Sequence, residues 1–365
     1  MSFGLPQALR NLLHNGPSIA RIPSRSVTAV TGSQASEFLN GMLASSVPDT
    51  PKRPFFSAIL NAQGRVLYDL LVYSDQDING RPGYLLEYDS RPSEATPLHD
   101  LLKRFVLRSK VKIRDVSSEF DAWAAWHSEH TETDLKKEWR FAESGAIEPA
   151  WPDSHSADHW PWGLGDRILI DRRAPGMGSR YLVRKGDKPQ ITSSFDEVPS
   201  DMYTIHRILR GVPEGIHDIT PTTAFPMESN LDVMGGLDFR KGCYVGQELT
   251  VRTYHKGAVR KRILPVMIKS HGGDLATTTL APELDIKASV LQLPLTEQKI
   301  PRPRGNGKLL TSINGVGLAL MRLEHVAGAE KKELELNISA GSEGSPEKYS
   351  IEHWWPDWWP RESRA

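Results

Sequence analysis

The sequence is poor in cysteine and contains no long apolar stretch. Cys243 is the only cysteine among 365 residues, which excludes internal disulfides and any metal site built from several local cysteines. The histidines are scattered and show no metal-ligand spacing. No apolar run approaches the roughly 20 residues that a transmembrane helix needs. A reducing compartment is compatible with this composition.

The chain also lacks an excess of charge of either sign. Basic and acidic residues balance at 45 each, so the formal net charge is zero. Nothing in this balance predicts direct binding to nucleic acid, which is typical of strongly basic domains. The phosphate-binding P-loop pattern and the nucleophile elbow of hydrolases are both absent. The composition therefore indicates a globular protein, and its length favours two or three domains.

Acidic residues are missing from the N-terminal segment, where the first acid is Glu37. Three arginines precede it, and a helix at the start of the chain would place four leucines on one face: Leu5, Leu9, Leu12 and Leu13. An acid-free, arginine-bearing amphipathic segment is typical of a mitochondrial transit peptide. An ordinary helix packed on the fold is the alternative. Residues 1–19 are accordingly assigned to a transit-peptide remnant or an N-terminal helix.

Residues 26–116 show alternating strand and helix patterns. Strands are predicted at 26–32, 83–88 and 110–116, and helices at 34–42 and 97–107. Residues 55–73 predict a hairpin that turns around Asn61-Ala62-Gln63-Gly64. This mixture of elements favours an α+β fold with an antiparallel sheet.

Less regular segments follow. Residues 128–161 are polar and without clean periodicity, which predicts an insertion or a long loop, and 185–200 predict another loop. A helix over 202–209 should end at Gly211 and Pro213. From about residue 262, short apolar runs separated by turns predict a small β-barrel or sandwich, interrupted by a mobile loop over 328–348.

The C-terminus carries four tryptophans within six residues, in HWWPDWWP. Exposed tryptophans are favoured in protein interfaces, so this tail could anchor a partner. Large exposed aromatic patches are unfavourable in water. The other interpretation is therefore that the tail packs over another domain of the same chain.

Cys243 lies in KGCYVGQE, a stretch rich in glycine and flanked by charge. Gly242 and Gly246 allow sharp turns and close approach of a ligand. Lys241 and the cations that follow would lower the pKa of a nearby thiol and favour the reactive thiolate. A lone cysteine is also often a small buried apolar residue. Spacing alone does not decide between these alternatives.

Lys241 to Glu248, K-G-C-Y-V-G-Q-E, closely resembles the signature of the YgfZ-type proteins. That family is similar to the tetrahydrofolate-dependent aminomethyltransferase of the glycine cleavage system. The continuation LTVRTYHKGAVRKRILPV resembles the mitochondrial branch, and weaker similar blocks extend from about residue 20 to 323. The resemblance implies two interwoven α/β lobes that form a folate-binding-like channel over 20–261, with the insertion near 128–161. A C-terminal β-barrel would then occupy 262–365.

The resemblance also implies a function. Members of the mitochondrial branch act in the mitochondrial matrix with A-type scaffold proteins, and they mature 4Fe–4S clients of the aconitase and radical-SAM types. Such clusters usually take four protein ligands, so one cysteine cannot hold a cluster alone. The expectation is a non-enzymatic assembly factor in which Cys243 is one ligand of an iron–sulfur cluster shared with a partner. Neither direct nucleic-acid binding nor membrane insertion is expected, although support of RNA modification through iron–sulfur enzymes is a weaker alternative.

A tetrahydrofolate-dependent aminomethyltransferase is the main rival function. Asp69 and Tyr73 match the transferase segment G-x-x-x-D-x-x-x-Y, in which the acid lies at the reacting end of the folate, although an exposed strand-edge acid is the ordinary reading of Asp69. The transferases lack the cysteine, which shifts the expectation toward the thiol. The expected ligands of a folate-like or anionic cofactor are Asp69, Tyr73, Glu228, Lys241, Gln247 and Arg252. Tyr244 and Glu248 would help to shape the loop, and Lys256, Arg260 and Arg262 would form a basic rim.

Overall fold

The computed structural model describes residues 5–12, 16–48, 53–76, 82–127, 137–151, 160–163, 165–270, 272–291, 303–341 and 347–360. These residues form two compact units. The smaller unit contains the described N-terminal residues 5–12, together with Thr204–Pro213 and Val259–Trp359. The larger unit contains the described residues within 16–203, together with Glu214–Ala258. Within the described residues, no helix is long and apolar enough to cross a membrane.

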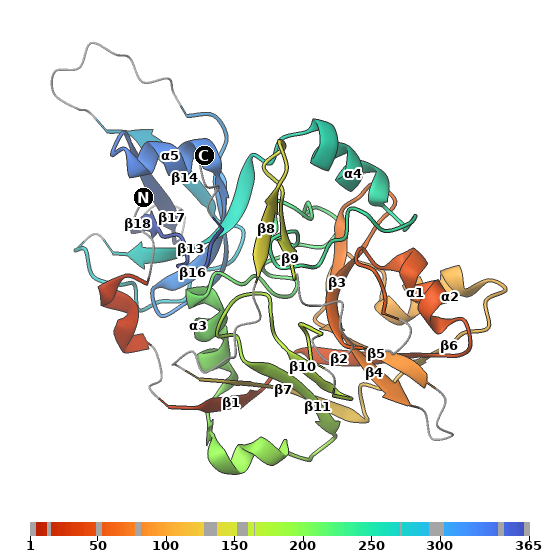
Figure 1. Ribbon diagram of the computed structural model, residues 1–365. Coiled ribbons are helices and arrows are strands. Elements are labelled where there is room, and N and C mark those ends of the chain that lie inside the picture. The colour runs from red at the N-terminus through yellow and green to blue at the C-terminus, as the bar shows by residue number, and fades with distance from the viewer. Residues whose placement is uncertain are drawn as a thin grey trace. The chain divides into compact units, whose positions relative to one another are not determined.

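The larger unit contains two five-stranded sheets. The first has the order β3-β4-β5-β2-β6 and is antiparallel throughout (Figure 1). Its strands are β2 (Arg25–Thr31), β3 (Phe55–Leu60), β4 (Val66–Gln76), β5 (Pro82–Asp89) and β6 (Lys112–Asp115). The helices α1 (Ala35–Met42) and α2 (Leu98–Val106) pack beside this sheet, and their buried residues follow the predicted helical spacing.

The second sheet has the order β10-β11-β7-β1-β12. Its strands are β1 (Ser18–Arg21), β7 (Phe120–Trp126), β10 (Ile168–Ile170), β11 (Ser179–Arg184) and β12 (Asp196–Glu197). Because β1 precedes the whole first sheet in the chain and its partner β7 follows it, the two lobes are interwoven, as predicted. The larger unit is completed by the hairpin β8 (Glu138–Phe141) and β9 (Ile147–Ala150), by the one-turn helix η3 (Gln190–Ser194), and by α4 (Gln247–Lys256).

The hairpin predicted at 55–73 is present. β3 pairs antiparallel with β4, and the turn is closed by the Asn61 backbone amide, which donates to Arg65 O, and by the Gly64 amide, which donates to Asn61 O. Gly64 has φ +75, a conformation that favours glycine. Every residue of β3 is buried, which agrees with a sequence that is apolar except for Ser57, whose hydroxyl accepts a hydrogen bond from the Ser45 amide.

The smaller unit is built on a closed six-stranded barrel of order β13-β16-β15-β14-β17-β18. Its elements are β13 (Lys261–Lys269), β14 (Asp285–Val290), β15 (Gly307–Ile313), β16 (Val316–Arg322), α5 (Leu323–Glu330), β17 (Leu334–Ala340) and β18 (Glu347–His353). Alternating inward residues of these strands form one apolar core, to which Leu264, Val266, Leu309 and Ile338 belong. The prediction of a C-terminal barrel is confirmed.

The tryptophan-rich tail packs onto this same unit. Trp354 and Trp359 are buried, Trp355 donates its indole N–H to Glu330, and Trp358 donates to the backbone oxygen of Arg210. Arg210 follows α3 (Ser200–Leu209), whose end at Gly211 was predicted. The tail is therefore docked, but the prediction that it packs over another domain needs correction, because Glu330 and Arg210 belong to the same unit as the four tryptophans.

Four local predictions need correction. The segment 185–200 is not a plain loop, because it contains η3 and strand β12, which pairs with β1. Residues 128–161 contain the hairpin β8–β9, although 128–136 and 152–159 lie outside the described residues. The segment 328–348 is not a single mobile loop, because it includes strand β17, which pairs with β14 and β18. The start of the chain forms a 3-10 helix, η1 (Gln7–Leu12), in which Leu9 is fully buried; Leu13 lies outside the described residues.

Candidate functional site

Cys243 lies in the irregular segment that precedes α4, and its side chain is exposed. Backbone hydrogen bonds fix the segment on both sides of the thiol. The amide of Asp238 donates to Ala44 O, and the amide of Val245 donates to Gly41 O. The buried alternative for Cys243 is therefore wrong: the thiol is accessible, and the backbone around it is held in place.

Lys241 anchors the thiol segment to the end of α1. Its ammonium group donates to the backbone oxygens of Asn40, Leu43 and Ser45 at 2.7, 2.7 and 3.1 Å. The last carbonyls of a helix lack intrahelical partners, so a cation there is favourable. Burial lowers the pKa of Lys241 to about 8, with Asp238 acting in the opposite direction. Lys241 thus shapes the loop, and its donors face protein carbonyls.

Gly246 and Gln247 begin α4 and have packing roles. Gly246 has φ +82, and a Cβ atom there would lie 2.2 Å from the backbone oxygen of Asn61, in the β3–β4 turn. The Gln247 side-chain oxygen accepts a hydrogen bond from the Tyr244 backbone amide at 3.3 Å. Gly242 differs from Gly246, because its φ is ordinary and a Cβ atom there would meet nothing within 4 Å.

A second anchor joins the thiol segment and α4 to the β8–β9 hairpin (Figure 1). The buried carboxylate of Glu148 accepts hydrogen bonds from the Tyr254 hydroxyl at 2.6 Å and from the Arg240 guanidinium at 2.9 Å. The ring of Phe239 stacks on Tyr254 with centroids 4.2 Å apart. The sequence pattern gave no hint of Glu148, because it lies in a segment read as an insertion.

A pocket of about 400 Å³ lies next to this anchor. Its walls are aromatic and its rim is charged. The aromatic residues are Phe55, Phe56, Trp151, Trp160 and Trp162, and the charged ones are Arg140, Glu148, Asp238 and Arg240. Aromatic walls with a few convergent polar groups are typical of small-molecule sites. None of the ligand residues predicted from the sequence lines this pocket.

Asp69 and Tyr73 lie elsewhere in the larger unit, where Asp69 belongs to a buried group of charges and the Tyr73 hydroxyl donates to it. We call it the central ion cluster; its members are Arg25, Asp69, Glu87, Asp171, Arg173, Arg180 and Glu214, all buried. Glu87 accepts hydrogen bonds from Arg25 at 3.0 Å, from the Tyr73 hydroxyl at 2.5 Å and from Arg180. Glu214 accepts from Arg173 and from the Tyr203 hydroxyl, each at 2.7 Å.

Asp69 is the least well paired member of the central ion cluster. Its Oδ1 accepts from the Gly215 backbone amide at 3.2 Å, whereas Oδ2 lies 3.6 Å from Nη1 of Arg25. Neither Oδ2 nor that Nη1 has a hydrogen-bond partner among the described residues. Burial raises the pKa of Asp69, the Arg25 charge opposes this, and Glu214 raises it further. The ordinary reading of Asp69 as an exposed strand-edge acid is therefore wrong.

The remaining predicted residues are dispersed. Glu228 is half-buried in the irregular segment between α3 and α4, whereas Arg252, Glu248 and Lys256 are exposed on α4. No hydrogen bond or ion pair joins Asp69 or Tyr73 to the thiol segment among the described residues. The predicted basic rim is incomplete for a physical reason. Arg262 is 2% exposed, and its guanidinium lies over the Trp359 ring, so it presents no charge to solvent.

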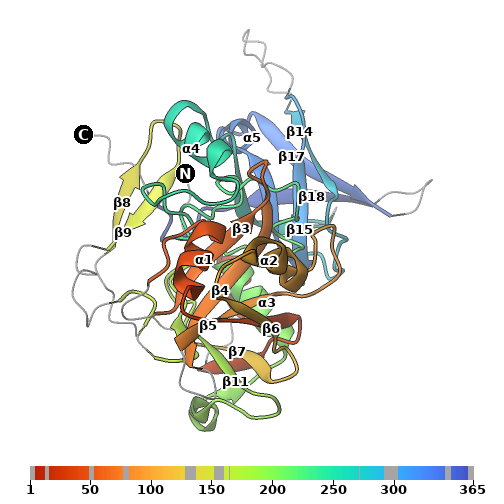
Figure 2. The ribbon, with the colours of Figure 1, turned by 90° about the vertical axis from the view of Figure 1, so that its right-hand side faces the viewer.

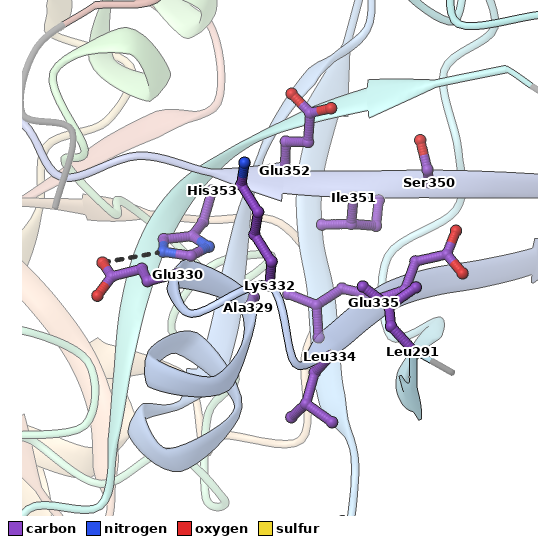
Figure 3. Close-up of a pocket in the computed structure, with 11 residues that line it drawn as sticks. Leu291, Ala329, Glu330, Lys332, Leu334, Glu335, Ser350, Ile351, Glu352 and His353 are labelled. Atoms are coloured by element: carbon purple, nitrogen blue, oxygen red, sulfur yellow. Dashed lines mark hydrogen bonds and ion pairs between the residues drawn. The ribbon is translucent and has the colours of Figure 1, made fainter. Parts of the chain in front are cut away.

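The barrel unit contains a separate hollow of about 710 Å³ (Figure 3). It is lined by the end of α5 and by β17 and β18, and within it Glu330 lies 3.4 Å from His353. Burial lowers the pKa of His353. No predicted site residue lies there, and within the described residues no group of three or more histidine, cysteine, aspartate or glutamate side chains could hold a metal ion.

The two glycines that flank Cys243 should respond differently to a methyl group. Gly246→Ala is expected to lower the free energy of unfolding by at least about 2 kcal/mol, because it combines a positive φ with a clash against Asn61 O. Gly242→Ala should change it by no more than about 0.5 kcal/mol. Urea denaturation measures the free energy of unfolding of both variants. Equal losses would contradict the conclusion that Gly246, but not Gly242, is required by the packing.

The chain is similar in sequence to known proteins, both in its barrel unit and over most of its length. Residues 260–361 match the family model described as "CAF17, C-terminal beta-barrel domain". The chain is 40% identical over 335 residues to the "Iron-sulfur cluster assembly factor IBA57 homolog, mitochondrial" of Cryptococcus neoformans var. neoformans, covering 84% of each chain. It is 33% identical over 374 residues to the protein of the same description from Neurospora crassa, covering 93% of this chain and 80% of the relative.

A solved structure shares the fold at low identity. The aminomethyltransferase T of the glycine cleavage system from Bartonella henselae superposes with a TM-score of 0.56 and 13% identity, covering 96% of this chain and 90% of the other. That similarity concerns the fold alone. The predicted architecture, interwoven lobes followed by a barrel, agrees with it.

Proposed function

Since the chain belongs to the family of mitochondrial IBA57-type iron–sulfur cluster assembly factors, we propose that Cys243 provides one ligand of a cluster that a partner protein completes. The partner would be an A-type scaffold protein, and the clients would be 4Fe–4S proteins of the aconitase and radical-SAM types. The cluster is cargo in this scheme. The single observation that carries the proposal is the exposed thiol on a fixed backbone.

The surroundings of Cys243 support a shared ligand. An iron–sulfur cluster is usually held by four protein ligands, whereas this chain has one cysteine, and its described residues contain no group of three or more histidine, cysteine, aspartate or glutamate side chains that could hold a metal ion. A Cβ atom on the neighbouring Gly242 would meet nothing within 4 Å, so the chain next to Cys243 is open on that side. The anchors at Lys241 and Glu148 hold the segment without covering the thiol.

Anaerobic mixing with a cluster-loaded A-type scaffold protein tests this proposal. The wild-type chain should produce a visible absorption spectrum that differs from that of the scaffold alone, and Cys243→Ser should not. The variant is expected to remain folded because the side chain is exposed, and circular dichroism verifies this. Identical spectra from folded wild-type and variant proteins would eliminate Cys243 as a cluster ligand.

A second candidate function rests on the aromatic pocket. The ring systems of tetrahydrofolate could stack on Trp160, Trp162 and Phe56, and its carboxylates could pair with Arg140 and Arg240. The residues present therefore fit this ligand class, and the group when bound would supply one-carbon chemistry. Asp69 does not line the pocket, and Phe56 contacts both the pocket and Arg173 of the central ion cluster. Binding without turnover is the outcome that this arrangement supports.

Titration with tetrahydrofolate, followed by tryptophan fluorescence, tests the second candidate. Arg140→Ala should weaken binding by about tenfold, as expected for loss of a charged hydrogen bond. Arg252→Ala is the matched control, because Arg252 is exposed on α4 and does not line the pocket. If only Arg252→Ala weakened the binding of tetrahydrofolate, its site would lie at α4 and not at the aromatic pocket. Turnover of an aminomethyl donor would instead support a transferase.

A further inference from the structure

The end of α2 and the turn that follows it expose two large apolar side chains. Leu107 is 87% exposed and Phe105 is 40% exposed, which places both among the exposed large hydrophobic residues of the described chain. Single exposed apolar residues are ordinary on protein surfaces. Phe105 lies in the last turn of α2 and Leu107 follows the helix, so the two lie close together in the chain, and other features of this turn bear on their role.

The backbone of Leu107 is the first such feature. Its torsions are φ 44 and ψ −106, and the Ser109 amide donates to Val106 O across the turn at 2.8 Å. These torsions lie near those of the first central residue of a type II′ turn, where glycine is preferred. Leucine at this position is both strained and exposed, so neither folding nor solubility explains it.

The turn is also held firmly. The backbone amide of Lys110 donates to the Gln34 side chain at 2.8 Å, just before α1. A Cβ atom on Gly32 would lie 2.2 Å from the backbone oxygen of Lys110, so the two segments pack in direct contact. A hollow of about 590 Å³ lies beside them and is lined by Gln34, Leu107, Arg108 and Ser109. A fixed apolar side chain beside a hollow has the geometry of a docking surface.

Positive charge predominates around the turn. Five exposed cations surround it, and within the described residues none of them forms an ion pair: Lys103, Arg104, Arg108, Lys110 and Lys112. Three exposed acids also lie nearby, and each has a local hydrogen-bond partner: Asp100 with His99, Asp115 with Ser117 and Glu37 with Gln34. The five cations outnumber them. Such a surface complements acidic groups. The hollow favours a protein, whose side chain can enter it, over a membrane surface.

Helix α1 connects this turn to the thiol. Gln34 precedes its first turn, and Lys241, two residues before Cys243, bonds the carbonyls at its far end. Eight helical residues rise about 12 Å. Figures 1 and 2 both show α1 and α2 side by side. The turn and the thiol segment are therefore attached to opposite ends of one short helix.

We propose that this turn, with Leu107, Phe105, Gln34 and the five cations, docks the protein that shares the cluster of Cys243. The partner would present acidic residues around an apolar side chain that enters the hollow. This inference rests on the proposed function, because it assigns a docking surface to the same partner. Docking and cluster ligation use different residues, so they can be tested separately.

The test measures binding of the apo A-type scaffold protein to the full chain by biolayer interferometry at several salt concentrations. Reversing three cations together, Lys103→Glu, Arg104→Glu and Arg108→Glu, should raise Kd at least about tenfold and flatten its salt dependence. The matched control reverses three exposed lysines of the barrel unit, Lys287→Glu, Lys331→Glu and Lys348→Glu. The control should bind like the wild type.

Leu107→Gly keeps the proposal falsifiable if the triple variant folds poorly. Glycine suits the positive φ, so this variant should be at least as stable as the wild type while its Kd rises. Wild-type affinity in both variants would overturn the proposal. Binding of the wild type, but not the triple variant, to vesicles of phosphatidylcholine with 30% phosphatidylglycerol, with scaffold affinity unchanged, would reassign the surface to membranes.

The same experiment separates this inference from the proposed function. Cys243→Ser should retain the docking affinity while losing the shared spectrum. If the scaffold docks at the turn but no spectrum depends on Cys243, the proposed function fails and the docking surface stands. If the spectrum depends on Cys243 but the turn variants bind normally, the docking surface fails alone.

Discussion

Cells that rely on a Cys243→Ser variant are expected to show an aconitase activity at least about tenfold lower than cells with the wild type. Losing a residue that only hydrogen-bonds to a metal ligand already lowers metal affinity or activity by about tenfold or more, so the loss of a ligand itself should cost at least as much. The serine hydroxyl has nearly the size of the thiol but is a poor ligand for iron in such clusters. Aconitase activity relative to citrate synthase, measured in a mitochondrial extract, reports the effect. The normalisation removes differences in mitochondrial content.

Two controls give this result its meaning. The abundance of the variant protein should equal that of the wild type, since an exposed side chain contributes little to stability. Gly246→Ala should lower both abundance and activity, because it disturbs the packing against the β3–β4 turn. Full aconitase activity in the Cys243→Ser cells would remove the thiol from the mechanism, whatever the spectra of the purified proteins show.

The sequence predicted those parts of the fold that depend on local pattern. The β3–β4 hairpin was read from two β-rich runs around Asn61–Gly64, and α1 and α2 from helical spacing. Strand β17 was missed although Leu334, Leu336 and Ile338 alternate with polar residues. The neighbouring charged, glycine-rich and serine-rich residues concealed that period. The strands of the β8–β9 hairpin have four residues each, and their positions do not alternate between buried and exposed, so no strand period marks them.

The candidate site was predictable only in part. The motif identified Cys243, but its exposure depends on contacts of Lys241 with α1 and of Gly246 with the β3–β4 turn, which are distant in sequence. The pocket combines β3, the β8–β9 hairpin and residues 160–162, and no local pattern joins them. Arg173 and Arg180 are fully buried, whereas arginine is mostly exposed in proteins, so composition gives no signal for the central ion cluster.

The second large effect is expected from a substitution in the central ion cluster, and it concerns the stability of the fold. Glu87→Gln is expected to lower the free energy of unfolding by about 3–5 kcal/mol, because it leaves two buried guanidinium groups without their shared carboxylate. Arg25 and Arg180 both donate to Glu87, which is completely buried, and Tyr73 adds a third hydrogen bond. Glutamine keeps the size of the side chain and removes the charge. Urea denaturation followed by tryptophan fluorescence measures the loss.

Asp69→Asn is the matched variant. It also replaces a carboxyl group of the cluster by an amide, but it is not expected to lower the free energy of unfolding at neutral pH as Glu87→Gln does. The cluster contains three guanidinium groups and four carboxyl groups, and Asp69 is the carboxyl whose pKa is raised by burial. A carboxyl with a raised folded pKa stabilises the fold below its unfolded pKa of 3.8, and this contribution is lost as the pH rises through the folded pKa. Asparagine stays neutral. The stability of Asp69→Asn relative to the wild type should therefore increase with pH across that window and then remain constant. A loss at neutral pH as large as that of Glu87→Gln would show instead that Asp69 is the charged partner of Arg25.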